Sequence, residues 1–382
     1  MLDYNMNIQM VDLISQYTSI KDEIDTALLT AVRSANFING PEVRSFQKNL
    51  EVYLDVKKVI PCANGTDALQ IAMMALELKP GDEVIVPAFT YIATAEVIAL
   101  LGLIPVWVEV DKSTFNIDIK AFELAITDRT KAVVPVHLFG QCADMEAILE
   151  IAKKYNLFVI EDAAQAIGGR YTFSNGRVMS AGTMGDIGCT SFFPSKNLGC
   201  FGDGGAVFTN NELLAEKIRM IANHGQAVKY QHDIIGINSR LDTVQASVLD
   251  IKLKYLDQYC VSRAKAASIY DDRLSNVKQI ITPIREANST HVFHQYTLVI
   301  TDGTRNDLKT YLGEQGIPTM VYYPIPMHLQ KAYLSDKYPE GTFPISERLA
   351  QSVLSLPIHT ELDISTQEFI CNSIIKFYAN EL

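Results

Sequence analysis

The sequence has no cluster of lysines and arginines, and its apolar runs are interrupted well short of the length of a membrane span. The 382 residues carry a net charge of −11. Since a nucleic-acid backbone is neutralised by clustered basic side chains, we expect no nucleic-acid partner. The first residues also lack the basic start and apolar segment of a secretory signal. We therefore expect a cytoplasmic protein with no membrane partner.

Patterned cysteines and histidines are missing as well. The six cysteines form no CxxC pair and have mostly apolar neighbours; they are Cys62, Cys142, Cys189, Cys200, Cys260 and Cys371. This pattern predicts buried free thiols in a reducing compartment. The seven histidines show no metal-ligand spacing, so we expect no metal site. His291 and His294 are predicted to lie on opposite faces of a strand.

The chain is longer than a single core usually supports, so we expect two domains. The predicted boundaries are 1–255, a large domain that includes an N-terminal arm, and 256–382, a small domain. From about residue 55, strands alternate with helices, which favours a mainly parallel sheet covered on both faces. The expected strands are Val84–Val86, Pro105–Val110, Ala132–His137, Phe158–Ile160, Ile187–Phe193 and Gly205–Phe208. The expected helices are Ser19–Ser34, Asp67–Leu76, Tyr91–Leu101, Met145–Tyr155, Glu212–Ala222 and a long bridge at Leu241–Leu274. The small domain is predicted to contain a strand at Val292–Ile300 and a helix near Asn306–Gln315.

Lys196 lies between an apolar segment and the glycine-rich turn Gly202–Gly205. A lysine in this setting loses its solvation, and a desolvated amine readily gives up its proton and can attack an aldehyde to form a Schiff base. Upstream, the predicted strand Phe158–Ile160 runs into the acids Glu161 and Asp162. Pyridoxal 5'-phosphate (PLP) requires a lysine for its aldehyde and an acid for its ring nitrogen. We therefore predict Lys196 and Asp162 as catalytic residues, although Asp162 alone is equally typical of a helix N-cap.

Gly65 and Thr66 follow a strand-to-helix turn, where free backbone N–H groups and a hydroxyl can bind a phosphate. The alternative is an ordinary N-cap by Asn64 or Thr66. Tyr91 follows another strand and can stack on an aromatic cofactor, or it can be a core aromatic. Arg240 can clamp a carboxylate or a phosphate, or it can form a structural ion pair.

Taken together, the segments Asn64–Leu69, Glu161–Gln165, Ser191–Gly205 and Asn238–Leu241 resemble the DegT/DnrJ/EryC1/StrS family of PLP-dependent sugar aminotransferases. The resemblance extends from Phe37–Pro41 to the C-terminal domain. It implies the type I aminotransferase fold and a homodimer with composite active sites. That fold is α/β, with a mainly parallel mixed sheet flanked by helices and a smaller C-terminal α/β domain.

The resemblance also implies the role of each site residue. Lys196 matches the lysine that binds PLP, and Asp162 matches the partner of the ring nitrogen. The implied cofactor-binding residues are Gly65, Thr66, Tyr91, Asp162, Gln165, Ser191, Lys196 and Asn238, the last from the other subunit. The implied substrate-binding residues are Asn36, Phe37, Ser195, Arg240, Tyr322 and Tyr323. Relatives often have His-Tyr-Pro where this chain has Tyr322-Tyr323-Pro324, so the sugar contact at Tyr322 is expected to differ.

Within the family, the chain looks similar to enzymes that aminate C3 of UDP-2-acetamido-2-deoxy-3-oxo-glucuronate with L-glutamate, for lipopolysaccharide O-antigen sugars. Arg240 would then bind the sugar carboxylate. The alternatives are an aminotransferase for a 4-keto sugar carried on dTDP, UDP or GDP, a sugar dehydratase of the same fold, and a sensor without catalytic activity. Some dehydratases of the family replace the lysine with histidine, so Lys196 favours amino transfer.

Overall fold

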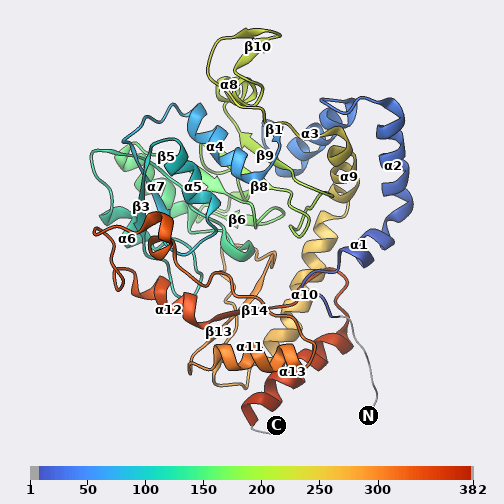
Figure 1. Ribbon diagram of the computed structural model, residues 1–382, viewed down its shortest axis with the longest axis vertical. Coiled ribbons are helices and arrows are strands. Elements are labelled where there is room, and N and C mark those ends of the chain that lie inside the picture. The colour runs from blue at the N-terminus through green and yellow to red at the C-terminus, as the bar shows by residue number, and fades with distance from the viewer. Residues whose placement is uncertain (1–7, 380–382) are drawn as a thin grey trace.

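A seven-stranded sheet forms the centre of the computed structural model, which describes residues 8–379 (Figure 1). Its strand order is β1-β9-β8-β5-β4-β2-β3, and only β9 runs against the others. The strands are β1 (Lys58–Cys62), β2 (Glu83–Pro87), β3 (Ile104–Val108), β4 (Thr130–Val133), β5 (Phe158–Asp162), β8 (Ile187–Ser191) and β9 (Gly205–Thr209). The mainly parallel sheet predicted from the sequence is therefore confirmed.

Helices cover both faces of this sheet. Along β2, Val84 and Val86 pack into one core cluster and Ile85 packs into another, as the alternation of a strand buried on both faces requires. One face carries α4 (Gly65–Ala75), α5 (Ala93–Leu100) and α8 (Glu212–Ala222). The other carries α3 (Pro41–Leu54), α6 (Ile119–Leu124), α7 (Met145–Tyr155) and α9 (Thr243–Leu253).

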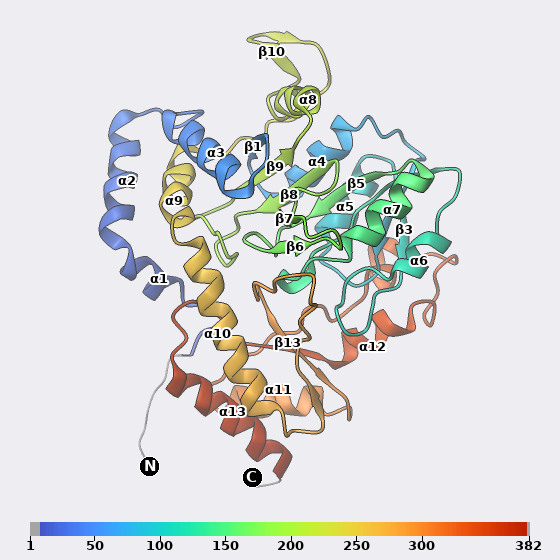
Figure 2. The same ribbon diagram turned by 180° about the vertical axis from the view of Figure 1, so that it is seen from behind.

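A smaller α/β unit follows α10 (Leu256–Leu274), a long helix that runs from the large sheet to the C-terminal helices (Figure 2). Its antiparallel sheet has the order β12-β13-β14, and its own core lies between this sheet and the helices. The elements are β12 (Ile280–Ile281), β13 (Tyr296–Ile300), α11 (Arg305–Glu314), α12 (Pro344–Ser352), β14 (Val353–Leu356) and α13 (Ile364–Ala379). The predicted arrangement of a large and a small α/β unit is confirmed.

The N-terminal arm contains α1 (Leu13–Ser19) and α2 (Lys21–Ser34). It lies against both units, since α2 packs on α9 and the backbone N–H of Ile358 donates to the carbonyl of Met10. The arm before α1 thus contacts the smaller unit, although the predicted boundary assigns it to the large domain. The boundary between residues 255 and 256 stays a prediction.

Three predicted elements differ from the structure by more than two residues at a bound or by a break within the element. The strand expected at Ala132–His137 ends at Val133, because Pro135 has no N–H for the ladder, and only an isolated bridge joins Val136 to Asp162. The long helical stretch expected at Leu241–Leu274 is instead two helices, α9 and α10, with a break between them. The strand expected at Val292–Ile300 begins at Tyr296.

The prediction that His291 and His294 lie on opposite faces of a strand is therefore wrong, because both residues precede β13. The ring of His291 instead stacks on Phe293 with 3.8 Å between centroids. Within residues 8–379, no group of three or more His, Cys, Asp or Glu side chains is placed to hold a metal ion.

The six cysteines are unpaired; Cys260 is half-buried and the rest are buried. Burial raises the pKa of the Cys142 thiol to about 12, which suits the free, unreactive thiols predicted from the sequence.

No helix in the described part of the chain is both long enough and apolar enough to cross a membrane. Two short hairpins complete the fold, β6–β7 (Arg170–Thr172 and Val178–Ser180) and β10–β11 (Gln226–Val228 and Gln231–His232).

Candidate active site

Sheet register brings the predicted cofactor residues to one edge. Gly205, the first residue of β9, pairs with Cys62 at the end of β1 and with Ser191 at the end of β8. Asp162 ends β5 and pairs with Cys189 of β8. The carboxyl ends of β1, β5 and β8 therefore meet, and this edge is where open parallel sheets bind ligands.

Gly65 and Ser191 form one wall of this edge. A Cβ atom on Gly65 would lie 2.7 Å from the Cβ of Ser191, so only glycine fits there. Asn64 caps α4 through its side chain, which accepts from the N–H of Asp67 at 2.8 Å. Asn64 is thus an ordinary N-cap, as the alternative supposed. Its side chain uses only the N–H of Asp67, so the N–H groups of Gly65 and Thr66 remain at the open start of the helix. These groups fit a phosphate, which is favoured at a helix N-terminus.

Asp162 is buried at the end of β5. Its Oδ2 accepts a hydrogen bond from the Thr94 hydroxyl at 2.9 Å, and its Oδ1 accepts from the N–H of Ala164 at 3.1 Å. A turn follows Asp162, so the alternative of a helix N-cap at this position is wrong. Thr94 could not be predicted as part of the site, because no local sequence pattern links the start of α5 to the end of β5.

Lys196 lies half-buried in the loop between β8 and β9, and its backbone N–H donates to the carbonyl of Phe193 at 2.8 Å. Loss of solvation lowers the pKa of the Lys196 amine to about 8, although the nearby Asp162 charge opposes the change. The predicted desolvated amine is therefore present.

His294 is a buried neighbour of Lys196, and no sequence pattern links the two residues. Burial lowers its pKa well below the ordinary value, and the charges of Lys196 and Arg263 act in the same direction. The Nδ1 atom of His294 has no hydrogen-bond partner in the described part of the chain.

Aromatic residues line the same region. The ring of Tyr91 lies 6.0 Å from the ring of Tyr323, and 54% of Tyr91 is exposed, so it is not a core aromatic. Gln165 holds Tyr323 in place. Its Nε2 donates to the Tyr323 hydroxyl at 3.0 Å, and its Oε1 accepts from the N–H of Phe139 at 2.8 Å. The ring of Tyr322 lies against Tyr323, 5.8 Å away between centroids.

The remaining predicted residues fall into two places. Ser195 is half-buried in the same loop as Lys196, one residue before it. Asn36, Phe37, Asn238 and Arg240 form a second group near β1, and no hydrogen bond or ring contact within residues 8–379 joins them to Asp162.

This second group is fixed by contacts of its neighbours. The Ser239 hydroxyl accepts from the N–H of Ala63 at 3.0 Å, which ties the segment before α9 to the end of β1. The carbonyl of Phe37 accepts from the N–H of Thr243 at 3.0 Å. Asn36, Phe37 and Asn238 themselves are exposed, so they present free side chains on the surface.

Arg240 lines a hollow of about 270 Å³ together with Arg44 and Arg219. No acidic residue lines it, and none of the three guanidinium groups pairs with a carboxylate of the described residues. The alternative of a structural ion pair for Arg240 is therefore wrong. Three unpaired positive charges in one hollow favour an anion.

The donor set at the sheet edge fits PLP. A lysine with a lowered pKa, a buried carboxylate, an open helix start and an exposed ring provide one group each for the aldehyde, the ring nitrogen, the phosphate and the ring face of that cofactor. The close approach of Gly65 to Ser191, which a Cβ would prevent, is the most specific of these observations.

Comparison with known proteins agrees with this geometry. The pattern of the DegT/DnrJ/EryC1/StrS aminotransferase family matches residues 18–375, and the chain belongs to this family. It is a PLP-dependent nucleotide-sugar aminotransferase with the type I fold, as the sequence predicted.

Two relatives are similar over nearly the full length. A "pleiotropic regulatory protein" of Geobacillus stearothermophilus is 47% identical over 98% of this chain and 99% of its own. The UDP-2-acetamido-2-deoxy-3-oxo-D-glucuronate aminotransferase of Pseudomonas aeruginosa is 46% identical over 96% of this chain and 99% of its own.

Solved structures share the fold. An aminotransferase of this family from Brucella abortus superposes with a TM-score of 0.91 at 41% identity, covering 97% of this chain and 99% of that one. The NtdA protein of Bacillus subtilis, solved with the bound cofactor PMP, gives a TM-score of 0.87 at 35% identity, covering 94% and 82%.

Proposed function

We propose that this enzyme transfers the amino group of L-glutamate to C3 of UDP-2-acetamido-2-deoxy-3-oxo-glucuronate. The similarity to the Pseudomonas aeruginosa enzyme supports the choice of sugar. The observation that carries it is the unpaired guanidinium of Arg240, which lies in a hollow without any acidic side chain and suits the carboxylate of a uronate or the diphosphate of its nucleotide.

Lys196 and Asp162 are the catalytic residues of this proposal. PLP supplies a ring that withdraws electrons from the carbon bearing the amino group. Lys196 would hold the aldehyde of this cofactor, and its free amine would take up and return the proton at the substrate carbon, since an amine with a pKa of about 8 exchanges protons near neutral pH. Asp162 would bind the ring nitrogen, where its negative charge would keep that nitrogen protonated, and the Thr94 hydroxyl fixes the orientation of this carboxylate.

Other residues bind and orient. The N–H groups of Gly65 and Thr66 and the Ser191 hydroxyl hold the phosphate, and Tyr91 stacks on the ring. Gln165 reaches the ring hydroxyl. Asn36, Phe37, Ser195, Tyr322 and Tyr323 contact the substrates, and the hydroxyl of Tyr322 acts there as a neutral hydrogen-bonding group.

We infer a homodimer with composite sites. Asn238 and Arg240 lie near β1 rather than beside Asp162, so they can serve the cofactor site of a second copy. Exposed apolar side chains on the same part of the molecule support this arrangement; they include Phe37 (47% exposed), Ile38 (50%) and Phe201 (41%). Light scattering that finds an active monomer would refute it.

The proposed setting is the cytoplasm, in the synthesis of amino sugars for lipopolysaccharide O-antigen. A two-step absorbance experiment tests the reaction. The holoenzyme is first treated with L-glutamate, which removes the visible absorbance of bound PLP, and the excess donor is stripped away. UDP-2-acetamido-2-deoxy-3-oxo-glucuronate is then added, and we expect the visible band to return within the dead time of manual mixing.

Each alternative gives a different result. Loss of the band with glutamate but no return with this sugar would reject the substrate, and 4-keto sugars on dTDP, UDP or GDP would then be tested. Turnover of a keto sugar without consumption of glutamate would indicate a dehydratase. Glutamate that leaves the band unchanged would favour a non-catalytic protein. Replacing Lys196→Ala should abolish turnover, and near-normal turnover would contradict its role.

A further inference from the structure

Glu161 stands beside Asp162 in β5 but faces the opposite side of the sheet. Neighbouring residues of a strand point to opposite faces, and their partners show this: Asp162 contacts Thr94 and Ala164, whereas Glu161 contacts His137 and the turn at residues 182–185. Nothing in the proposed chemistry uses Glu161 or His137, yet both are fully buried.

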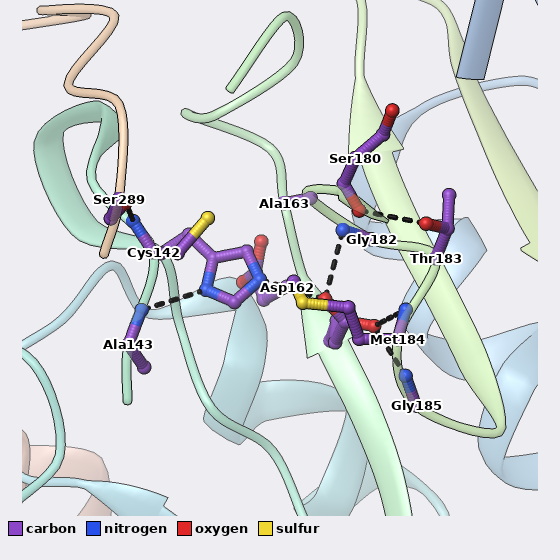
Figure 3. Close-up of polar contacts among 12 residues, drawn as sticks. Cys142, Ala143, Asp162, Ala163, Ser180, Gly182, Thr183, Met184, Gly185 and Ser289 are labelled. Carbon is purple, nitrogen blue, oxygen red and sulfur yellow. Dashed lines mark hydrogen bonds and ion pairs between the residues drawn. The ribbon is translucent and has the colours of Figure 1, made fainter. Parts of the chain in front are cut away.

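The carboxylate of Glu161 accepts four hydrogen bonds. Its Oε1 accepts from the N–H groups of Met184 at 2.6 Å and Gly185 at 2.5 Å, and its Oε2 accepts from the N–H of Gly182 at 2.8 Å. Figure 3 shows these backbone contacts converging on one carboxylate beside Asp162. The fourth partner is Nε2 of His137, at 2.9 Å. Because the three backbone partners can only donate, the arrangement suits the charged carboxylate.

The second nitrogen of His137 fixes its tautomer. Nδ1 lies 3.2 Å from the backbone N–H of Ala143 and must accept from it, so the ring proton is on Nε2 and points at Glu161. The backbone of the same histidine is tied to the neighbouring strand, since its N–H donates to the carbonyl of Asp162 at 3.0 Å. The N–H of Asp162 in turn donates to the carbonyl of Pro135 at 2.9 Å.

The pair therefore joins three segments that are distant in the sequence. The turn after His137 contains Phe139, whose N–H donates to Gln165. The turn at residues 182–185 packs directly on β5 and leads into β8 and the Lys196 loop; a Cβ on Gly182 would lie 3.1 Å from the Cβ of Ala163. Loosening the pair would release the end of β5 on both sides.

We propose that Glu161 and His137 are positioning residues that hold Asp162 against the ring nitrogen of PLP. They act through the backbone of β5 and through the two turns, and they do not touch the cofactor. Their loss would displace the Asp162 carboxylate and so change both the affinity for PLP and the protonation of the bound cofactor.

A matched pair of variants at His137 tests this on the holoenzyme. In His137→Gln the amide nitrogen can reach the position of Nε2 and keep the hydrogen bond to Glu161. In His137→Asn the shorter side chain can keep only the bond to Ala143. Glu161→Gln removes the charge while keeping the length. The readouts are the dissociation constant of PLP, the midpoint of the pH titration of its visible absorbance, and the melting temperature.

We expect His137→Asn and Glu161→Gln to weaken PLP binding by about tenfold or more and to move the titration midpoint, because each loses the charge-assisted bond between the two side chains. His137→Gln should stay within about threefold of the wild type. Melting temperatures that fall while PLP affinity and midpoint stay unchanged would overturn the proposal, and so would equal effects of Gln and Asn. If Glu161→Gln fails to fold, the comparison at His137 still decides, since it leaves the three backbone bonds of Glu161 in place.

Discussion

The lowered pKa of Lys196 makes a quantitative prediction about how the apoprotein takes up PLP. The amine has a pKa of about 8 instead of its usual 10.5. At pH 7.5 this leaves about a quarter of it neutral, against roughly one part in a thousand for an ordinary lysine. Since only the neutral amine attacks an aldehyde, the rate at which Lys196 bonds to PLP should rise with pH and level off above about pH 8–9.

Stopped-flow mixing of apoprotein with PLP across pH 6–10.5 measures this rate through the visible absorbance. A simple primary amine in the same buffers serves as the control, because it corrects for the ionisation of PLP itself. Lys196→Ala should show no covalent phase. In Asp162→Asn the inflection should move to lower pH, because the aspartate charge raises the pKa of Lys196.

Two results would refute this reasoning. An inflection near pH 10 in the wild type would mean that Lys196 is as well solvated as a surface lysine. An inflection that moves upward in Asp162→Asn would mean that the carboxylate acts on Lys196 through something other than its charge.

Three further predictions test the structure more broadly. Gly65→Ala places a Cβ 2.7 Å from Ser191 and should weaken PLP binding by about tenfold or more in equilibrium dialysis, whereas Gly313→Ala, which meets no atom within 4 Å, should leave binding unchanged and stabilise its helix by about 0.5–1 kcal/mol. Arg263→Met removes the donor to three buried carbonyl groups and should lower the free energy of unfolding by about 2–4 kcal/mol in urea titrations; a change below 1 kcal/mol would contradict this. Burial lowers the pKa of Lys252 to about 8, so between pH 8 and 10.5 the unfolded chain binds a proton that the folded one does not, and the stability of the wild type relative to Lys252→Met should rise with pH in that window. A constant difference would contradict that assignment.

Local pattern was sufficient for most of the elements. The helices at Met145–Tyr155 and Glu212–Ala222 match α7 and α8 in both bounds, because each begins after a capping side chain and carries a clear apolar face. The strand at Ala132–His137 was predicted to end too late, since the apolar run continues past Val133 while Pro135 interrupts the ladder. The break between α9 and α10 was missed because the residues at the break favour a helix as much as those on either side.

The residues of the proposed site also differ in whether local sequence could indicate them. Lys196 and Asp162 could be proposed from short segments, because each lies at or after the end of a recognisable strand and carries a side chain that PLP needs. Thr94 and His294 could not, because each is linked to the site only by a residue far away in the chain. The roles of Asn36 and Phe37 remain proposals, and the role of Asn238 depends on a second copy.

The sequence by itself determined the alternation of strands and helices, the open start of α4 and the side chains that we propose as catalytic, because periodicity, capping and turn chemistry act over a few residues. Only the tertiary structure decided which of these meet. The order and register of the strands bring Gly65 within contact of Ser191, lower the pKa of Lys196 by burial, and turn Glu161 away from the site toward His137. Such contacts depend on the packing of the whole sheet, so no short segment of the chain contains them.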